Sequence, residues 1–369
     1  MTTRHLATGD TLKSLLLSVP VESSGSSLRV EPLRAAHLHG LQSEGLGDWL
    51  PRLQGLLLRS LVARLDGLWP GEPITRQPRV LVALEQGVLR ALVQVRPYNR
   101  QGSCWLLSLE ELSPGQWVGR RELLKALLQQ ALLGTDVHSR SWVIRCDSSC
   151  DEQLDVLREL GFQPLKTQRI WQTGNGEASQ AAALPRTPTS LPTSCQWSAL
   201  NRRTAPLLWP LEQAACSSHL RQIIDRRCSD LLDQSGRDTG VLLCDSGEGA
   251  VAIAGLVRQE LADGSFGIEL LRDVAWDGRL RQALPALLHQ LLTQRPGVAL
   301  VTDQADSALT QLLSTGGWQP VREELLLGRS LWRQHGRSRA VPLTHSLDTM
   351  LGRLQPQHPP LPTPSLGRR

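Results

Sequence analysis

The chain has 369 residues, of which 40% are apolar and 20% charged, a composition that excludes disorder throughout and predicts two or three domains. Its formal net charge is +5, and residues 333–369, with six Arg and only one acid, account for all of it. Residues 1–332 are neutral, so a basic nucleic-acid-binding domain is not expected.

The first part of the chain predicts helices interleaved with short strands. Residues 1–27 are expected to be an N-terminal extension, because their apolar run is too short for a signal peptide. The predicted elements then follow in chain order: a strand at 28–33, helices at 35–42 and 50–65, strands at 79–84, 88–96 and 104–111, a helix from about Gly119, a strand at 141–146, a helix at 149–160 and a strand at 162–172. This order predicts an α/β (α+β) fold with a mixed, mostly antiparallel sheet flanked by helices.

The second part repeats the first. "DSSCDEQLDVLRELGFQP" (147–164) aligns without a gap with "DQADSALTQLLSTGGWQP" (303–320), and "SCWLLSLEEL" (103–112) aligns with "SFGIELLRDV" (265–274). The apolar helix stripes also align: Leu124, Leu127, Leu128, Ala131 and Leu132 correspond to Leu284, Leu287, Leu288, Leu291 and Leu292. We therefore expect two tandem domains, at 28–172 and 195–334.

Two further segments have the composition of connectors. Residues 173–194 are rich in Gly, Ser, Thr and Pro and predict a linker. Residues 335–369 predict a disordered, basic, Pro-rich tail that recruits a partner. A tether to an anionic surface is a weaker alternative, because the tail's arginines are widely spaced.

The cysteines predict free thiols in a reducing compartment, which is taken to be the cytoplasm. The seven Cys are scattered, and Cys146 and Cys150 have no further Cys or His nearby that would complete a metal site. No apolar run approaches the roughly 20 residues that a membrane helix needs. Neither a metal nor a membrane partner is expected.

The element order, together with "LRELGFQP", resembles the GCN5-related N-acetyltransferase (GNAT) superfamily, whose last helix ends in a similar phrase before a strand. The resemblance covers most of both copies. It implies tandem acyl-CoA N-acyltransferase-like domains, each with a sheet splayed between its fourth and fifth strands and acyl-CoA in the gap. It also implies that the loop after strand four binds the cofactor pyrophosphate, with the signature Gln or Arg, two residues, Gly, one residue, then Gly or Ala.

The first copy keeps part of this loop signature. Gln116 and Gly119 have the required spacing, but Arg121 stands where a small residue is usual. Backbone amides at a helix start can bind an anion, and Arg can add two hydrogen bonds to phosphate. A plain turn into a basic first helical turn is the alternative. The expected acetyl-CoA-binding residues are Leu112, Gln116, Val118, Gly119, Arg120 and Arg121.

The corresponding loop of the second copy is degenerate. It has a single Gly278, and Asp277 places a negative charge where phosphate would lie. We therefore expect the second copy to be non-catalytic.

The catalytic candidates are Glu110 and Glu111, at the end of strand four, where other family members place a catalytic Glu. Strand alternation sends one toward each face, so at most one can reach the substrate. Carboxylates that only solvate a strand end are the alternative. The family's Tyr acid is absent, since its positions hold Leu157 and Leu313, and the only Tyr is Tyr98.

The resemblance therefore implies an acyl-CoA-dependent N-acetyltransferase, in which acetyl-CoA is the cosubstrate and a small-molecule or protein amine attacks the thioester directly. The amide of Leu112 is expected to polarise the thioester carbonyl. The alternative is a non-enzymatic tandem GNAT-fold scaffold.

Overall fold

The computed structural model describes residues 19–23, 26–39, 41, 46–66, 78–112, 119–135, 139–173, 190–245, 247 and 249–331. The predicted tail, most of the predicted linker and residues 113–118 of the predicted cofactor loop, including Gln116 and Val118, lie outside these ranges.

The first copy follows the predicted order, with one strand added and one helix shortened. Its elements are β1 (Val19–Ser23), β2 (Ser26–Pro32), η2 (Ala35–Leu38), η3 (Gly47–Trp49), α1 (Leu50–Asp66), β3 (Arg79–Glu85), β4 (Val88–Pro97), β5 (Cys104–Glu111), α2 (Arg120–Leu133), β6 (Ser141–Asp147), α3 (Asp151–Glu159) and β7 (Gln163–Thr173). β1 lies within the predicted extension and pairs with β2. The helix predicted at 35–42 is only a 3-10 helix at Ala35–Leu38, because so short a segment gains too few hydrogen bonds to offset the cost of starting a helix.

The second copy repeats this order. Its elements are β8 (Cys195–Ala199), α5 (Ala205–Ala215), α6 (Ser218–Ile224), η4 (Cys228–Gln234), β9 (Gly240–Asp245), β10 (Ala250–Glu260), β11 (Phe266–Arg272), α7 (Gly278–Gln294), β12 (Leu300–Asp303), α8 (Ser307–Thr315) and β13 (Trp318–Ser330).

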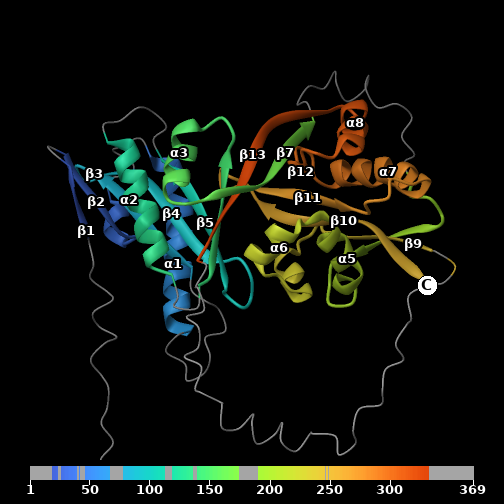
Figure 1. Cartoon of the computed structure of the whole chain (residues 1–369), viewed down its shortest axis with the longest axis horizontal. Helices are drawn as coiled ribbons and strands as arrows, with labels where there is room; N and C mark the ends of the chain where they lie inside the picture. The colour runs from blue at the N-terminus through green and yellow to red at the C-terminus, as the bar shows by residue number, and fades with distance from the viewer. Residues whose placement is uncertain are drawn as a thin grey trace, which may run out of the picture. The chain divides into compact units, whose positions relative to one another are not determined.

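All the strands join one continuous sheet (Figure 1), in the order β1-β2-β3-β4-β5-β6-β13-β7-β12-β11-β10-β9-β8. β5 runs parallel to β6 and β11 runs parallel to β12, whereas the other neighbours are antiparallel. The prediction of a mixed, mostly antiparallel sheet flanked by helices is confirmed.

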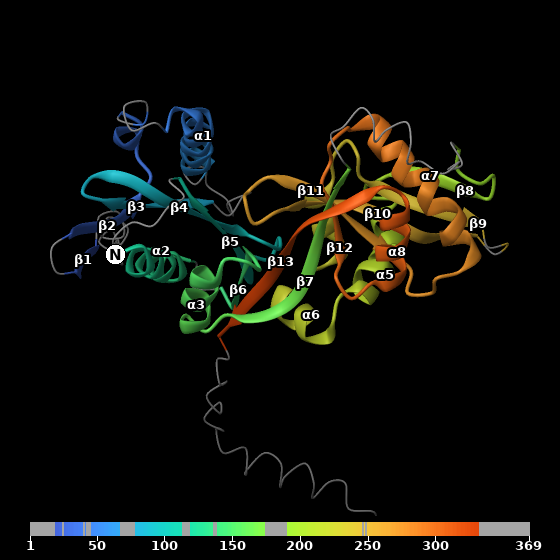
Figure 2. The same ribbon diagram turned by 90° about the horizontal axis from the view of Figure 1, so that it is seen from above.

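The last strands of the two copies are exchanged. β13, from the second copy, pairs with β6 of the first, and β7, from the first copy, pairs with β12 of the second. β7 and β13 also pair with each other along their length, and Figure 2 shows them side by side between the two halves. The boundaries predicted from the repeat separate the two copies in the sequence. In space, each half of the sheet is completed by the last strand of the other copy.

Two hairpin turns also cross between the halves. The β4–β5 turn reaches the second copy, where the Asn99 side-chain amide donates to the carbonyls of Ile224 and Asp225, both at 2.9 Å. The β10–β11 turn reaches the first copy, where the carbonyl of Gly264 accepts a hydrogen bond from Arg52. Each copy therefore contributes a turn to the other's surface.

The apolar stripes form the cores of both halves. α2 and α3 pack on one face of the first half of the sheet, and α1 packs on the opposite face (Figure 2). The equivalent positions of α2 and α7 share the same burial, from Leu124 and Leu284 to Ala131 and Leu291. The glycines that follow the last helices have left-handed backbone, since Gly161 has φ of 81° and Gly317 has φ of 80°.

One cysteine pair corrects the sequence interpretation. Cys195 and Cys244 lie opposite each other on β8 and β9 and form a disulfide. The other five cysteines are free. The expectation of free thiols throughout the chain is therefore wrong for this pair, whose members are far apart in sequence and become neighbours only through strand pairing.

Candidate active site

The parallel strands β5 and β6 separate at one end. Their register extends from Cys104 and Ser141 to Leu107 and Ile144, although β5 continues to Glu111. The last residues of the two strands are therefore not paired with each other, which is the splay that the GNAT resemblance implies. In the second copy β11 and β12 likewise pair with each other over a short register and then continue without pairing with each other.

Glu110 and Glu111 face opposite sides of the sheet at this splay, as alternation predicts. Glu110 faces α1, and its Oε1 accepts from Arg52 Nη2 at 2.7 Å. Glu111 faces α2, where Arg120 donates to both of its oxygens at 2.7 and 2.8 Å. The two carboxylates therefore have different surroundings, although they are neighbours in sequence.

Glu110 has the properties of a general base that works near neutral pH. It is 5% exposed, and its Oε2 is buried without a hydrogen-bond donor. Burial raises the pKa of Glu110 to about 7, a rise that Arg52 opposes and that Glu260 and Asp263 reinforce. A carboxylate with such a pKa can accept a proton at neutral pH.

The predicted loop ends at a helix start that no side chain of the described residues caps. Gly119, at φ of 80°, is the N-cap of α2 and makes no side-chain cap hydrogen bond. In the second copy the carboxylate of Asp277 accepts from the amides of Arg279 and Leu280, at 3.0 and 3.1 Å. Among the described residues, therefore, no side chain caps the first copy's helix, whereas the second copy fills the equivalent position with its own anion.

The arginines of the predicted loop are already bound to acids. Besides Glu111, Arg120 bonds Glu152 on α3. Arg121 bonds Glu159, also on α3, and Lys125 donates to the same carboxylate at 3.0 Å. The Arg121 side chain is thus directed toward α3, and a phosphate at this helix start competes with carboxylates for both arginines.

The amide of Leu112 is not available to polarise a thioester. It donates to the carbonyl of Arg90 at 2.9 Å, because β5 stays paired with β4 to its end. Since hydrogen-bonding direction alternates along a strand, the amides of Leu109 and Glu111 point instead toward the unpaired edge beside β6. The alternation of β5 in the sequence was the signal that could have identified these two.

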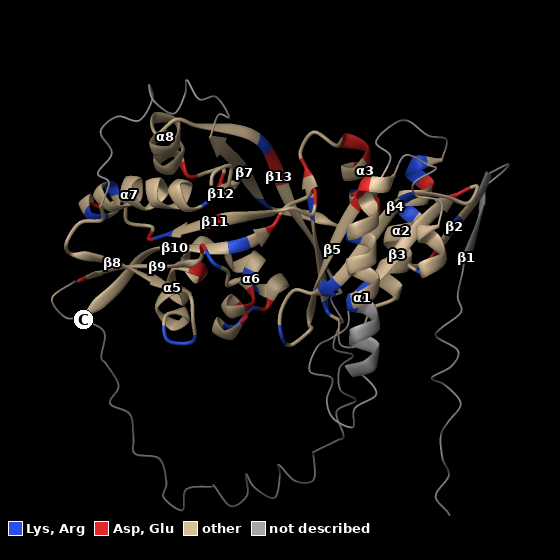
Figure 3. Cartoon of the chain, turned by 180° about the vertical axis from the view of Figure 1, so that it is seen from behind, with Lys and Arg blue, Asp and Glu red and all other residues tan. Residues whose placement is uncertain are grey.

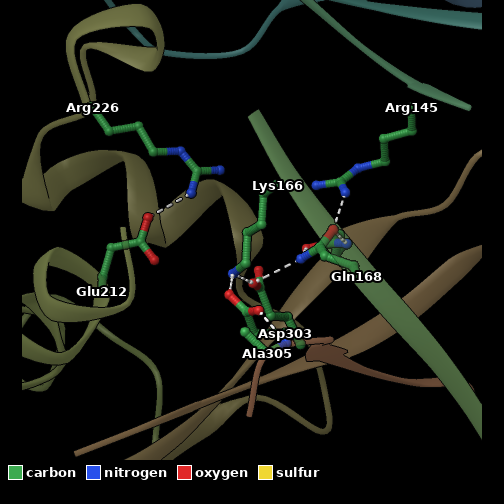
Figure 4. A network of polar contacts seen from close by, with 9 residues as sticks. Arg145, Lys166, Gln168, Glu212, Arg226, Asp303 and Ala305 are labelled. Atoms are coloured by element: carbon green, nitrogen blue, oxygen red, sulfur yellow. Dashed lines mark hydrogen bonds and ion pairs between the residues drawn. The ribbon is translucent and has the colours of Figure 1, made fainter. Parts of the chain in front are cut away.

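In the second half of the sheet, which β7 of the first copy completes, the face beneath α5 and α6 is filled by paired charges (Figure 4). Lys166 Nζ lies 3.3 Å from Glu269 Oε1, and Arg226 donates to Glu212 at 2.9 Å. Burial acts to lower the pKa of Lys166, but Glu269 and Asp303 outweigh it and raise the pKa. The remaining cavity is about 30 Å³, which is room for about one water molecule.

The second copy has a larger pocket between α7 and α8. Its volume is about 650 Å³, and its lining includes Trp276, Trp318, Arg281 and His289 among apolar side chains. The guanidinium of Arg272 lies over the ring of Trp276 and pairs with Asp306, the N-cap of α8, through two hydrogen bonds at 2.6 and 2.8 Å.

No tyrosine approaches either splay. Leu157 and Leu313, at the positions of the family's Tyr acid, are fully buried in the cores. Glu110 pairs with Leu92, near the start of β4, whereas Tyr98 follows the last residue of that strand. The Tyr98 ring lies under the guanidinium of Arg226.

Lys and Arg are interspersed with Asp and Glu over the described chain (Figure 3). Among the described residues, no helix is long and apolar enough to span a membrane. Within the same ranges, no three His, Cys, Asp or Glu side chains gather in a way that could hold a metal ion.

No protein-family model and no curated protein matches the chain. Among solved structures, a tandem GNAT protein from the clavulanic acid biosynthesis pathway is similar over 82% of this chain and 98% of its own, with 12% identity and a TM-score of 0.48. A GCN5-related N-acetyltransferase from Sphaerobacter thermophilus is similar over 74% and 91%, with 14% identity and a TM-score of 0.44. Another from Kribbella flavida is similar over 75% and 94%, with 13% identity and a TM-score of 0.43.

Both halves of the chain fit the fold that the sequence resemblance implied. Each has the element order that the sequence resemblance implied, including the parallel pair that separates at one end.

Proposed function

We propose that the protein is an acyl-CoA-dependent N-acyltransferase whose first copy holds the reaction site. The observation that carries this proposal is Glu110, a buried carboxylate with an unpartnered oxygen and a pKa of about 7, placed where β5 leaves β6. An acceptor amine that donates to Oε2 would satisfy this oxygen and lose its proton to it.

In the proposed reaction, Glu110 takes a proton from the amine, and the nitrogen lone pair attacks the thioester carbonyl. The carbonyl oxygen accepts from the amides at the unpaired edge of β5, those of Leu109 or Glu111, as negative charge develops on it. The C–N bond forms, the C–S bond breaks, and the CoA thiolate takes a proton from the protonated Glu110 or from water. Leu157 and Leu313 stand at the positions of the family's Tyr acid and cannot donate a proton. The proposed reaction therefore uses no tyrosine.

Acyl-CoA would be held at the N-terminus of α2, where no side chain of the described residues forms a cap. Gly119 allows the left-handed backbone there, and a side chain at this position would be strained. Arg120 and Arg121 reach the phosphates when they exchange their carboxylate partners on α3 for phosphate oxygens. The acceptor is a small-molecule or protein amine, and the cytoplasm is the proposed compartment.

A non-enzymatic binding protein is the second candidate, and the ion pairs favour it. Arg120, Arg121 and Lys125 are all neutralised by acids in the first copy, and Arg272 pairs with Asp306 in the second. On this alternative the ion pairs close both splays permanently and the tandem fold presents a surface to a partner, for which the tail, outside the described residues, is a further candidate.

Calorimetric titration of acetyl-CoA into the protein tests the proposal. We expect binding by the wild type, loss of binding in Gly119→Trp, and unchanged binding in Gly278→Trp, the matched change at the start of α7, where no atom lies within 4 Å of an added Cβ. If acetyl-CoA does not bind the wild type, the proposal that the protein is an acyl-CoA-dependent enzyme is wrong. Binding without thiol release in the presence of any of a panel of amines would favour the binding protein.

A further inference from the structure

The second copy forms part of the surface around Glu110. In the β10–β11 turn, the amide of Ala262 donates to Glu324 Oε1 at 3.1 Å, and the carbonyl of Gly264 accepts from Arg52 Nη2 at 3.4 Å. A Cβ on Gly264 would lie 2.2 Å from Arg52 Nη2 and 2.8 Å from Glu110 Oε1. The turn is therefore packed directly against the Arg52–Glu110 ion pair.

Most acids around this turn have a cation other than Arg52. Glu260 pairs with Arg96, and Arg322 pairs with both Asp263 and Glu324. Within the described ranges, Glu110 has an ion pair with Arg52 alone. Without the Arg52 side chain, the carboxylates of Glu110, Glu260, Asp263 and Glu324 would have only the guanidinium groups of Arg96 and Arg322 to balance them. The position that Arg52 leaves would then attract a cation.

The two partners of the Arg52–Glu110 pair differ in exposure. The Arg52 side chain is 39% exposed, whereas that of Glu110 is 3% exposed. An ion pair with one solvent-exposed arginine contributes little, because the long side chain gains freedom and hydration when it leaves. Glu110 has no such alternative, since it is fixed on β5 and buried. Arg52 is thus the partner that an incoming cation can replace.

On the basis of the proposed function, we propose that the acceptor is a small aliphatic amine that binds as its ammonium ion in the position of the Arg52 guanidinium. The ammonium donates to Glu110 and to the carbonyl of Gly264, so the second copy's turn is one wall of the first copy's acceptor site. One N–H proton passes to Glu110, which frees the nitrogen lone pair to attack, and a second leaves the nitrogen as the C–N bond forms. Of these two protons, one reaches the departing CoA thiolate and the other passes to water. The carboxylates around the turn disfavour amines that carry a carboxylate of their own.

The test measures binding of 1,4-diaminobutane by calorimetry at about pH 8.5, where the diamine is charged. In Arg52→Ala the internal competitor is absent, and we expect the diamine to bind about tenfold more tightly than to the wild type. Arg52→Ala combined with Glu110→Gln should lose this gain. Arg59→Ala, which removes an exposed Arg from the same helix, is the matched control and should bind as the wild type does.

A diamine affinity that is equal in Arg52→Ala and wild type, or that survives Glu110→Gln, would overturn the inference. Acetyl-CoA titrations of the same proteins separate it from the proposed function. If acetyl-CoA binds but Arg52→Ala does not bind the diamine more tightly than the wild type, only the proposed acceptor is wrong. Diamine binding without acetyl-CoA binding would contradict the proposed acyltransferase function, and the position of Arg52 would then be a cation-binding site only.

Discussion

The carboxylate of Glu110 and the guanidinium of Arg52 form an ion pair at 2.7 Å between β5 and α1, in which only Arg52 is substantially exposed. The pair joins the end of a splayed strand to a solvent-facing helix. Of the two neighbouring acids, Glu110 lies on the face of the sheet that carries α1 and the β10–β11 turn, and Glu111 lies on the other face.

Replacing Glu110 should test its role as the base. Glu110→Gln keeps the size of the side chain but cannot take a proton, and we expect turnover to fall by about 10²- to 10⁴-fold. Glu111→Gln should have a smaller effect on turnover, because Glu111 binds Arg120 on the other face. Acetyl-CoA-dependent thiol release measures both. A larger loss in Glu111→Gln would reverse the assignment.

The pH dependence of kcat/KM should report the ionisation of Glu110. A base must be deprotonated to act, so the rate should rise with pH and level off above the pKa of about 7. Arg52 acts to lower this pKa, so Arg52→Ala should move the rising limb to higher pH. A limb that stays in place in Arg52→Ala would show that another group controls the rate.

The burial of Glu110 should also appear in stability. Its pKa rises from 4.5 to about 7 on folding, so the folded chain binds this proton more tightly than the unfolded chain. The stabilisation is complete below about pH 4.5 and is lost as the pH rises through 7, an effect of at most about 3 kcal/mol. Glu110→Gln, which does not ionise, should therefore gain stability relative to the wild type between about pH 5 and pH 8.

Urea denaturation of both proteins across this pH range measures the difference. Glu122→Gln, a change at an exposed carboxylate on α2, is the control and should run parallel to the wild type. Parallel curves for Glu110→Gln and wild type would show that Glu110 titrates as an ordinary carboxyl.

Freeing Arg120 should strengthen acyl-CoA binding. Glu152→Gln removes one of the two carboxylates that hold its guanidinium, and we expect acetyl-CoA affinity to rise several-fold at low salt. Asp155→Asn, on the outer surface of α3, is the control. Weaker binding by Glu152→Gln would mean that the ion pair supports the loop rather than competing with the phosphate.

The thiol count should reveal the disulfide. In denaturant without reductant, Ellman titration should find five thiols among the seven cysteines, and Cys195→Ser together with Cys244→Ser should leave this count unchanged. Seven thiols in the protein as isolated would show that the pair is reduced, in line with the reducing compartment predicted from sequence.

Much of each half could be predicted from local patterns. The strands at 79–85, 88–97 and 104–111 and the left-handed Gly161 and Gly317 follow from alternation and capping, which act over a few residues. The opposite orientations of Glu110 and Glu111 follow from alternation too, but which of them meets α1 depends on how helices fold over the sheet.

The exchange of β7 and β13 could not be predicted in this way. Both strands follow the same kind of helix and turn, and each offers the same backbone groups to β6 or β12. Local preference is therefore equal for either arrangement, and contacts far apart in sequence decide between them. The Arg52–Gly264 contact, across 212 positions, escaped sequence reasoning for the same reason.

The exchanged strands bear on how a duplicated gene can decay. After duplication, a copy that loses its phosphate-binding residues is normally free to be deleted. Here deletion of the second copy would remove β13 and leave β6 with an open edge, while β7 would lose its partners. A second copy without activity of its own would therefore still be needed, because its final strand completes the sheet of the first.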